Sequence, residues 1–350
     1  MKTLSRIAGS AAALALFVAP VSVAAAADYF HGKTITVTVP AGSGGTYHVY
    51  CLLISAHLGR HIPGNPTLIV NNRPGGGGAT AAAYMASVAP KDGTAIAMMA
   101  PGSITAPLAH PLPYKATEFK WLGSAAARSS AIWVWHTKKI STLDQLKTQE
   151  VTIGSTGYGA GGSIMPRLIN EAFGTKMKIV YGYKSGGSIN IAIERSEVDG
   201  RWNYPNGFEG VRPTWLPEKK IIPIIAMGPR DAKRLPGVPH IDDLLKKGTR
   251  LWRLKELIDL DYQVGQAFYA PPDTPDNVMK ILRTAFVNMV KDPVTQQDFD
   301  KRRIELSPIS AEKISNMVKS TLTSVTGDDI KMFKDIYLDK SKVANKGKKK

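Results

Sequence analysis

Between Val151 and Phe173 the chain reads Val-Thr-Ile, then Gly154-Ser-Thr-Gly-Tyr-Gly-Ala-Gly-Gly-Ser163, then a mostly apolar segment that begins at Ile164. The first three residues are typical of a short buried strand, the glycine-rich stretch of a tight turn, and the last segment of a helix. A strand that leads through such a turn into a helix is the repeating unit of a parallel sheet with crossover helices. This stretch therefore predicts an α/β fold.

The same succession of a short strand and a small-residue turn occurs at four other places. The strands span residues 34–39, 67–70, 94–99 and 178–180, and the turns span residues 41–45, 72–78, 101–103 and 182–188. A chain of 350 residues is long enough for two domains with separate cores. We therefore expect two α/β lobes, each a mainly parallel sheet flanked by helices, with residues 28–128 and 227–338 in the first lobe and residues 129–226 in the second.

The two ends of the chain differ from the rest. Lys2 and Arg6 precede a short apolar core, and Ala25-Ala26-Ala27 offers a small-residue cleavage site, so residues 1–27 are typical of an export signal peptide that is cleaved near Ala27. A retained membrane anchor is the alternative, because residues 7–27 carry no charge. Residues 339–350 form a basic tail with six lysines, which we expect to be a solvated end.

The composition limits the possible partners. The chain has 45 Lys and Arg residues against 28 Asp and Glu residues, and the formal net charge of +17 favours anionic partners without naming them. The basic residues are scattered along the chain, so we expect no nucleic-acid partner. The single cysteine, Cys51, excludes an internal disulfide, and its apolar neighbours predict a small buried hydrophobe.

The motifs for cofactor and catalytic chemistry are incomplete. Residues 157–162 match the dinucleotide fingerprint, but the segment about twenty positions further on contains no acid to hold a ribose. Neither a Walker phosphate loop nor a Gly-x-Ser-x-Gly nucleophile elbow occurs in the sequence. His57 and His61 have the spacing of metal ligands on a predicted helix, but no third ligand is evident. We therefore expect no cofactor, no metal and no enzymatic activity.

The small-residue turns are the best candidates for a binding site. In open α/β sheets a ligand binds beyond the carboxyl ends of the strands, where helix N-termini present main-chain N–H groups to anions. Hydroxyl groups in the turns can add neutral hydrogen bonds, and they belong to Ser43, Thr46, Ser103, Ser155, Thr156, Ser163, Ser185 and Ser188. Ordinary helix caps and tight turns are the alternative explanation for each of these residues. The recurrence of such turns in both predicted lobes favours a shared cleft.

Six stretches, taken in order, carry a resemblance to a known family. They are Val39-Pro-Ala-Gly-Ser-Gly-Gly45, Asn72-Arg-Pro-Gly-Gly-Gly-Gly78, Ala89-Pro-Lys-Asp-Gly-Thr94, the stretch from Ile153 to Ser163, Ser196-Glu-Val-Asp-Gly200 and Ala270-Pro-Pro-Asp-Thr-Pro275. This ordered set resembles the periplasmic solute-binding receptors of tripartite tricarboxylate transporters, over about residues 33–338.

The resemblance implies a two-lobed, periplasmic-binding-protein-like fold of the Venus-flytrap type (type II). It implies a small organic carboxylate held between the lobes by main-chain N–H groups, hydroxyls and ordered water. It also implies a monomer in the periplasm that delivers its ligand to the membrane permease subunits of a tripartite transporter or to a sensor protein.

The resemblance also points to particular residues. The positions that grip the ligand in relatives match Gly45, Thr46 and Tyr47 before and within one predicted helix, and the turn from Ser155 to Ser163, which contains Gly159. Where the family usually has Asp, this chain has His48, which we expect to alter the ligand specificity.

Four side chains in or near the turns are also candidates. Arg201 follows a predicted strand, and a guanidinium there can clamp a carboxylate through two hydrogen bonds, although an ion pair that stabilises the lobe is the alternative. Tyr47 and Tyr183 can line a pocket or pack in the core, and Lys184 is a candidate that we expect to be solvated.

Together these features predict a protein that captures a small carboxylate without catalysis. The main alternative is an exported hydrolase or transferase that uses the same cleft. A second alternative is an adhesive protein that binds through its basic tail.

Overall fold

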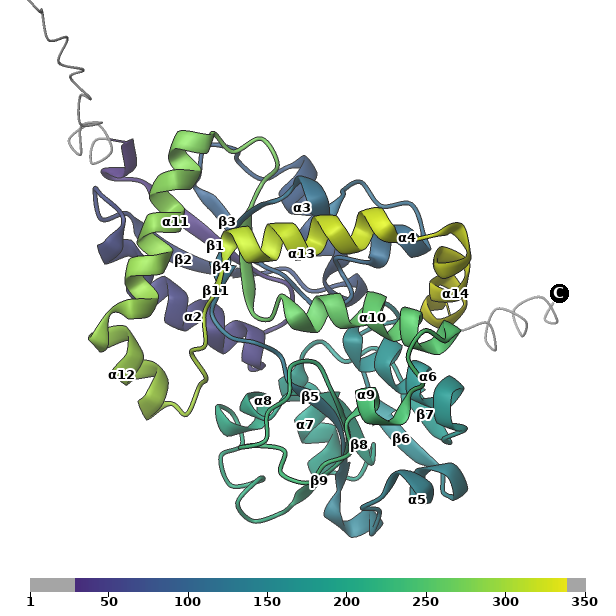
Figure 1. The fold of residues 1–350 in the computed structure, drawn as a ribbon. Helices are drawn as coiled ribbons and strands as arrows, with labels where there is room; N and C mark the ends of the chain where they lie inside the picture. The colour runs from purple at the N-terminus through teal and green to yellow at the C-terminus, as the bar shows by residue number, and fades with distance from the viewer. Residues whose placement is uncertain (1–28, 339–350) are drawn as a thin grey trace, which may run out of the picture.

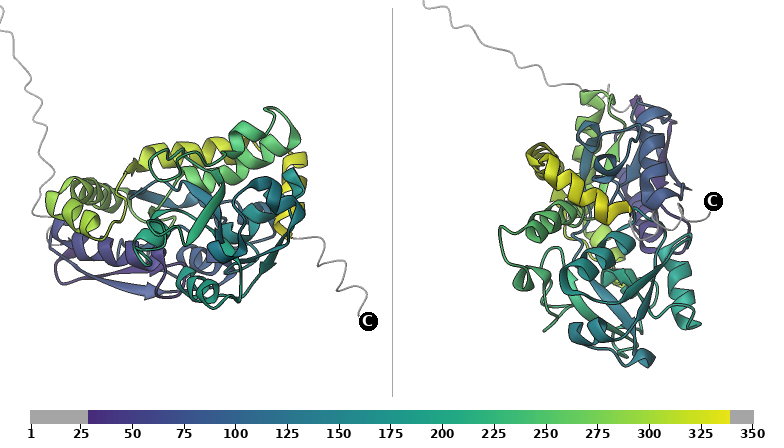
Figure 2. Two further views of the ribbon diagram at one scale, coloured as in Figure 1. Left: turned by 90° about the horizontal axis from the view of Figure 1, so that it is seen from below. Right: turned by 90° about the vertical axis from the view of Figure 1, so that its right-hand side faces the viewer.

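The computed structural model describes residues 29–338, so the predicted signal peptide (1–27) and basic tail (339–350) lie outside the described residues. The described chain forms two lobes, each built on one β-sheet (Figure 1). The first sheet lies in the upper part of that view and the second in the lower part, and helices lie on the outside of both (Figure 2).

The first sheet has six strands within the described residues, in the order β11-β4-β10-β3-β1-β2. β1 pairs in parallel with β2 and β3, whereas β10 pairs antiparallel with β3 and β4, and β11 pairs antiparallel with β4. The strands are β1 (Thr34–Val39), β2 (Thr67–Asn72), β3 (Ala95–Met98), β4 (Lys120–Ser124), β10 (Ala267–Ala270) and β11 (Ile309–Ser310).

The second sheet has five strands in the same described range, in the order β7-β6-β8-β5-β9. β6 pairs in parallel with β7 and β8, whereas β5 pairs antiparallel with β8 and β9. The strands are β5 (Ser130–Trp135), β6 (Val151–Gly154), β7 (Met177–Val180), β8 (Gly200–Asn203) and β9 (Ile221–Met227).

The predicted two-lobed α/β fold is confirmed, but both sheets are mixed rather than mainly parallel. The parallel parts are β2-β1-β3 and β7-β6-β8, which hold the predicted strand, turn and helix units. β4 and β5 are the strands on either side of the first passage between the lobes, and both take part in antiparallel pairs. A strand that arrives from the other lobe needs no crossover helix, so nothing in the repeat constrains its direction.

Helices cover both faces of each sheet. On the first sheet, α2, α11 and α12 share a core with one face, and α3 and α13 share a core with the other. On the second sheet, α5, α6 and α9 pack on one face, and α7 and α8 pack on the other. Their bounds are α2 (Thr46–Leu58), α3 (Ala79–Ser87), α5 (Leu143–Thr148), α6 (Gly161–Phe173), α7 (Gly186–Glu194), α8 (Asn206–Glu209), α9 (Ile241–Leu244), α11 (Asp276–Lys291), α12 (Pro293–Lys301) and α13 (Ala311–Ser324).

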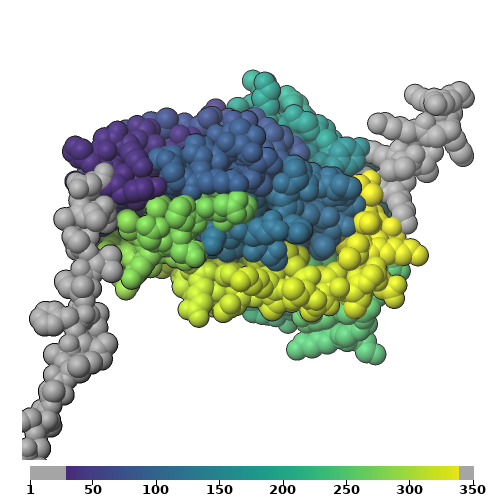
Figure 3. Space-filling model, turned by 90° about the horizontal axis from the view of Figure 1, so that it is seen from above, coloured from purple at the N-terminus to yellow at the C-terminus, as the bar shows by residue number. Residues whose placement is uncertain are grey.

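Three helices connect the two lobes. α10 (Arg250–Gln263) places Leu257 in a second-lobe core and Leu260 in a first-lobe core. α4 (Ala106–Ala109) and α14 (Gly327–Leu338) pack against each other and join the same second-lobe core. α13 and α14 form a continuous yellow band on one face of the molecule (Figure 3).

The exact division of the chain between the lobes stays a prediction. After β9 the chain still contacts the second sheet, because His240 forms a bridge with Ala226 and α9 packs in a second-lobe core. The chain rejoins the first sheet only at β10, which is later than the boundary expected at residue 226.

A buried arginine lies where the chain passes from β4 to β5. Arg128 is 0% exposed, and its Nη2 donates to the Met99 carbonyl oxygen at 2.7 Å and to Gln266 Oε1 at 3.0 Å. Met99 follows β3 and Gln266 precedes β10, so the Arg128 side chain ties the passage between the lobes to two strands of the first sheet.

Two residue types singled out in the sequence have structural roles. Cys51 is fully buried, as predicted, and burial raises the pKa of its thiol. His57 Nε2 lies 2.9 Å from Asp298 Oδ2 and His61 Nε2 lies 3.1 Å from Asp292 Oδ2. Between residues 29 and 338 no group of three or more His, Cys, Asp and Glu side chains is arranged to hold a metal ion. The helices in this range are also too short or too polar to cross a membrane.

Replacing Arg128 by Met should lower the free energy of unfolding by about 1–3 kcal/mol, because the Met99 carbonyl loses its partner in a site closed to water. Urea denaturation followed by circular dichroism measures the change. Arg195→Met is the control, because the Arg195 side chain is 70% exposed and its nearest acid, Glu197, is 3.9 Å away, so its effect should stay within about 0.5 kcal/mol. Equal effects of the two substitutions would contradict the role given to Arg128.

Candidate ligand-binding site

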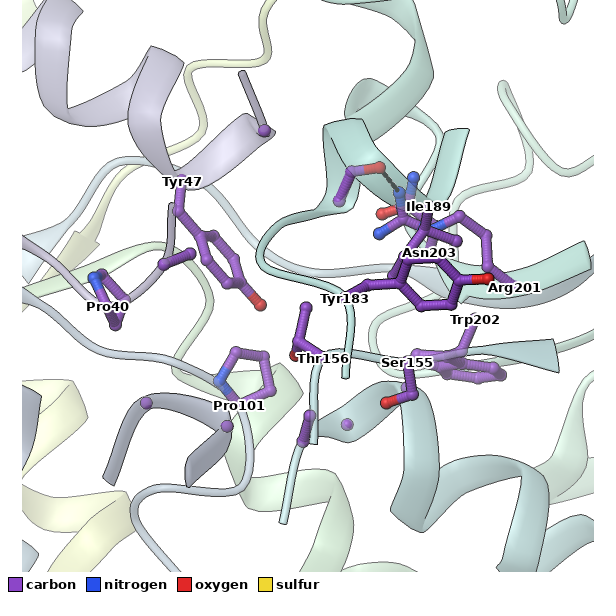
Figure 4. A pocket seen from close by; sticks show the side chains of 18 of the residues that line it. Pro40, Tyr47, Pro101, Ser155, Thr156, Tyr183, Ile189, Arg201, Trp202 and Asn203 are labelled. Carbon is purple, nitrogen blue, oxygen red and sulfur yellow. Dashed lines mark hydrogen bonds between the residues drawn. The ribbon is translucent and has the colours of Figure 1, made fainter. Parts of the chain in front are cut away.

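A cavity of about 320 Å³ lies between the two lobes, at the carboxyl ends of their strands. Its first-lobe wall comes from the segments that follow β1, β2 and β3, and its second-lobe wall from those that follow β6 and β7 and from the end of β8. Figure 4 shows Pro40, Tyr47 and Pro101 on one side and Tyr183, Ile189 and Arg201 on the other. The cavity therefore lies where strand ends from both lobes meet.

Two helices present uncapped N-termini to this cavity. Thr46 and Tyr47, in the first turn of α2, and Gly161 and Gly162, in the first turn of α6, line it. The N-cap residues of both helices, Gly45 and Ala160, make no side-chain capping hydrogen bond. The first N–H groups of a helix lack partners within the helix and carry partial positive charge, so both ends favour an anionic ligand.

The turns of the two lobes touch through their main chains. The Gly42 N–H donates to the Lys184 carbonyl oxygen at 3.0 Å. A Cβ atom on Gly187 would lie 2.3 Å from the Gly44 carbonyl oxygen, and a Cβ atom on Gly102 would lie 2.1 Å from the Gly159 carbonyl oxygen. Such distances leave no room for side chains, so the lobes are closed on each other and glycine permits the closure.

Arg201 brings a positive charge to the second-lobe wall. Its Nη1 donates to the Gly186 carbonyl oxygen at 2.7 Å and to Asn190 Oδ1 at 2.9 Å, and no acid among the described residues forms an ion pair with it. Burial lowers the pKa of Arg201 to about 10, with the nearby Tyr204 and Tyr47 hydroxyls acting in the opposite direction. The guanidinium is therefore still charged at neutral pH and has no counterion among the described residues, which is unfavourable for a charge partly shielded from water.

Aromatic rings form the apolar part of the wall. The rings of Tyr47 and Tyr204 lie 6.4 Å apart, and those of Trp202 and Tyr262 meet edge to face at 5.8 Å. Burial raises the pKa of Tyr47, Tyr204 and Tyr262, so their hydroxyls stay neutral and can donate hydrogen bonds. The cavity thus combines an apolar body with hydrogen-bond donors and one half-buried cation.

Of the residues proposed from the sequence, about half line the cavity. Gly45, Thr46, Tyr47, Ser155, Thr156, Tyr183 and Arg201 line it. The cavity is not lined by Ser43, His48, Ser103, Gly159, Ser163, Ser185 or Ser188. Lys184 lines the cavity and is exposed, as expected.

Several of the residues outside the wall hold the turns in shape. The Ser163 hydroxyl donates to the Gly157 carbonyl oxygen at 2.5 Å and lies 2.6 Å from the Ser155 hydroxyl oxygen. Ser185 caps α7, together with Ser188. The alternative explanation, helix caps and tight turns, therefore describes these three hydroxyls.

Four larger side chains of the wall were not predicted from the sequence. Trp202, Asn203 and Tyr204 follow Arg201 at the end of β8, and the position of Arg201 at a strand end was the signal for them. Tyr262 comes from α10, far along the chain from the turns, and no local pattern points to it.

Comparison with known proteins matches most of the chain to one family model. A family model described as "Tripartite tricarboxylate transporter family receptor" matches residues 60–327. A UPF0065 protein of Agrobacterium vitis is 25% identical over 285 residues, which cover 79% of this chain and 77% of that protein.

Solved structures share the fold. The periplasmic binding protein BugD superposes with a TM-score of 0.70 at 19% identity, covering 87% of this chain and 97% of its own. MatC from Rhodopseudomonas palustris with bound malate gives a TM-score of 0.66 at 17% identity, covering 87% of this chain and 99% of its own. A second R. palustris protein, solved with adipate, gives a TM-score of 0.65 at 20% identity, covering 83% of this chain and 94% of its own.

The glycine contacts predict that Gly187→Ala keeps the lobes apart. Gly187 lies inside α7, where alanine suits the helix, so the clash with the Gly44 carbonyl oxygen is the main effect of the substitution. Small-angle scattering of the variant should give a larger radius of gyration than the unchanged protein. Gly327→Ala, at the start of α14 with open space around its Cβ position, is the matched control and should leave the radius unchanged. A Gly187→Ala variant as compact as the control would contradict this account of closure.

Proposed function

We propose a function from one premise: the chain belongs to the tripartite tricarboxylate transporter receptor family, whose model matches residues 60–327. The protein binds a small organic carboxylate in the cavity between its lobes. It carries no catalytic step, and it delivers the ligand to membrane permease subunits of a tripartite transporter or to a sensor protein. It acts as a monomer in the periplasm, after removal of residues 1–27.

The observation that carries this proposal is the unpaired charge of Arg201 beside two uncapped helix N-termini. The guanidinium has no acidic partner between residues 29 and 338, and the first turns of α2 and α6 add partial positive charge at the same cavity. A bound carboxylate supplies the counterion for Arg201 and accepts hydrogen bonds from the first N–H groups of the two helices. The aromatic rings of Tyr47 and Trp202 then contact its organic part.

Two further findings support the proposal. Two proteins with the same fold have been solved with malate and with adipate, both of which are small carboxylates. The closed contact between the lobes fits a receptor in which the ligand favours the closed population by touching both walls.

The geometry favours a receptor over an exported hydrolase. Ser155 is a hydroxyl in the wall, but its oxygen lies 2.6 Å from that of Ser163 and 3.4 Å from the Gly157 carbonyl oxygen. These contacts engage Ser155 in the shape of the turn. A nucleophile requires instead a base within hydrogen-bond reach.

The test is thermal unfolding of the mature chain, residues 28–350, with a panel of carboxylates, amino acids, sugars and phosphates. A ligand at about a hundredfold above its Kd stabilises the folded chain by about 2.7 kcal/mol, which is a readable shift. We expect a rise in Tm with carboxylates. A rise only with sugars or phosphates would contradict the ligand class.

Arg201→Met should weaken binding of the best carboxylate about 30-fold or more, because removing one partner of a buried charge pair costs about 2–5 kcal/mol. Isothermal titration calorimetry measures the Kd. Arg195→Met, on the exposed end of α7, is the control and should bind as the unchanged protein does. Unchanged affinity in Arg201→Met would remove Arg201 from the site.

A further inference from the structure

We propose that Arg167 and Tyr337 are positioning residues, through which the C-terminal helix α14 sets the shape of the ligand loop. The ligand loop is defined here as Ser155–Ser163, the segment that runs from the end of β6 through the first turn of α6. This inference rests on the proposed function, because it assigns a role in ligand binding to residues that do not line the cavity.

Arg167 joins three segments of main chain. Its Nη1 donates to the Tyr337 carbonyl oxygen at 2.7 Å, and its Nε donates to the Ser163 carbonyl oxygen at 3.0 Å. Its Nη2 donates to the carbonyl oxygen of Tyr158. Tyr337 belongs to α14, Ser163 to the first turn of α6, and Tyr158 to the middle of the ligand loop. Arg167 is 8% exposed, so this fork of hydrogen bonds is shielded from water.

Tyr337 supports the ligand loop from behind. The side chain is 3% exposed, and its hydroxyl oxygen lies 1.9 Å from the place that a Cβ atom on Gly159 would occupy. A side chain at position 159 would therefore displace the Tyr337 side chain. The ring of Tyr337 also packs near the rings of His110 and Phe333, at 5.3 Å and 5.4 Å, which fix its own position.

The other side of the ligand loop meets the first lobe. A Cβ atom on Gly77 would lie 2.6 Å from the Ala160 nitrogen, and one on Gly102 would lie 2.1 Å from the Gly159 carbonyl oxygen. The loop is thus held between the glycine turns of the first lobe and the Arg167–Tyr337 pair. Within the second lobe the loop is also joined to the end of β7, because the Ser155 N–H donates to the Val180 carbonyl oxygen at 2.8 Å and the Tyr158 ring stacks on that of Tyr181 at 4.2 Å.

This arrangement matters for binding because the first turn of α6 presents its free N–H groups at the end of the loop. A loop already held in the binding geometry loses less conformational entropy when a ligand arrives. Helix α14, more than 160 residues further along the chain, supplies that support.

Arg167→Lys and Tyr337→Ala test the inference, with hydrogen–deuterium exchange of the full mature chain without ligand as the first readout. Arg167→Lys keeps the charge but loses the fork, and Tyr337→Ala removes the support behind Gly159. Both should speed exchange of the amides in residues 155–163 by about tenfold or more. Tyr337→Phe should keep the slow exchange of the unchanged protein, because this substitution keeps the aromatic ring.

Arg283→Lys is the matched control, since Arg283 Nε donates to the Trp121 carbonyl oxygen at 2.8 Å in the first lobe, away from the cavity. Arg283→Lys should leave exchange of the ligand loop unchanged, even if it lowers the Tm as much as Arg167→Lys or Tyr337→Ala does. Loop exchange in Arg167→Lys and Tyr337→Ala at the rate of the control overturns the inference.

The second readout is affinity for the best carboxylate, measured well below the Tm of every variant. We expect about tenfold weaker binding in Arg167→Lys and Tyr337→Ala, and unchanged binding in Arg283→Lys. Faster loop exchange with unchanged affinity overturns the role in binding. If the unchanged protein binds no carboxylate, the proposed function fails, and the exchange experiment still decides whether α14 holds the loop.

Discussion

Main chain packs directly against main chain across the cleft, and the rest of this structure depends on that contact. Gly187 meets the Gly44 carbonyl, Gly102 meets the Gly159 carbonyl, and Gly77 meets the Ala160 nitrogen. A side chain at any of these positions would hold the lobes apart. The same glycines that form the turns thus permit the closure, and the cavity takes its size from backbone segments that touch at its rim.

Closure of the lobes brings uncompensated positive charge together at the cavity. The first turns of α2 and α6 reach the cavity without side-chain caps, and Arg201 reaches it without an acidic partner in the part of the chain that the structure describes. Partial positive charge from the helices and a full charge from the guanidinium are then shielded together from water. An anionic ligand would neutralise this positive charge. The geometry of the site therefore agrees with the family to which the chain belongs.

Local chemistry made much of the fold predictable. β1 was expected over the residues that it has, and so was the small-residue turn that follows it. The antiparallel pairings of β5 and β10 were not expected, because strand direction depends on the path between lobes rather than on local pattern. Turn hydroxyls were found in the same way, but their roles were not: Thr46 and Ser155 line the cavity, whereas Ser185 caps a helix.

The sequence by itself determined the α/β class, the places where strands end in small-residue turns, and the membership of a receptor family. The first two follow from residues within one or two turns of chain, and the third from the order of six such stretches along it. Only the tertiary structure decided which walls face each other. Tyr262 enters the cavity and Tyr337 supports Gly159 from helices far away in sequence. Such contacts arise when packed helices bring distant segments together, and no periodicity or turn propensity encodes the direction in which a side chain then points.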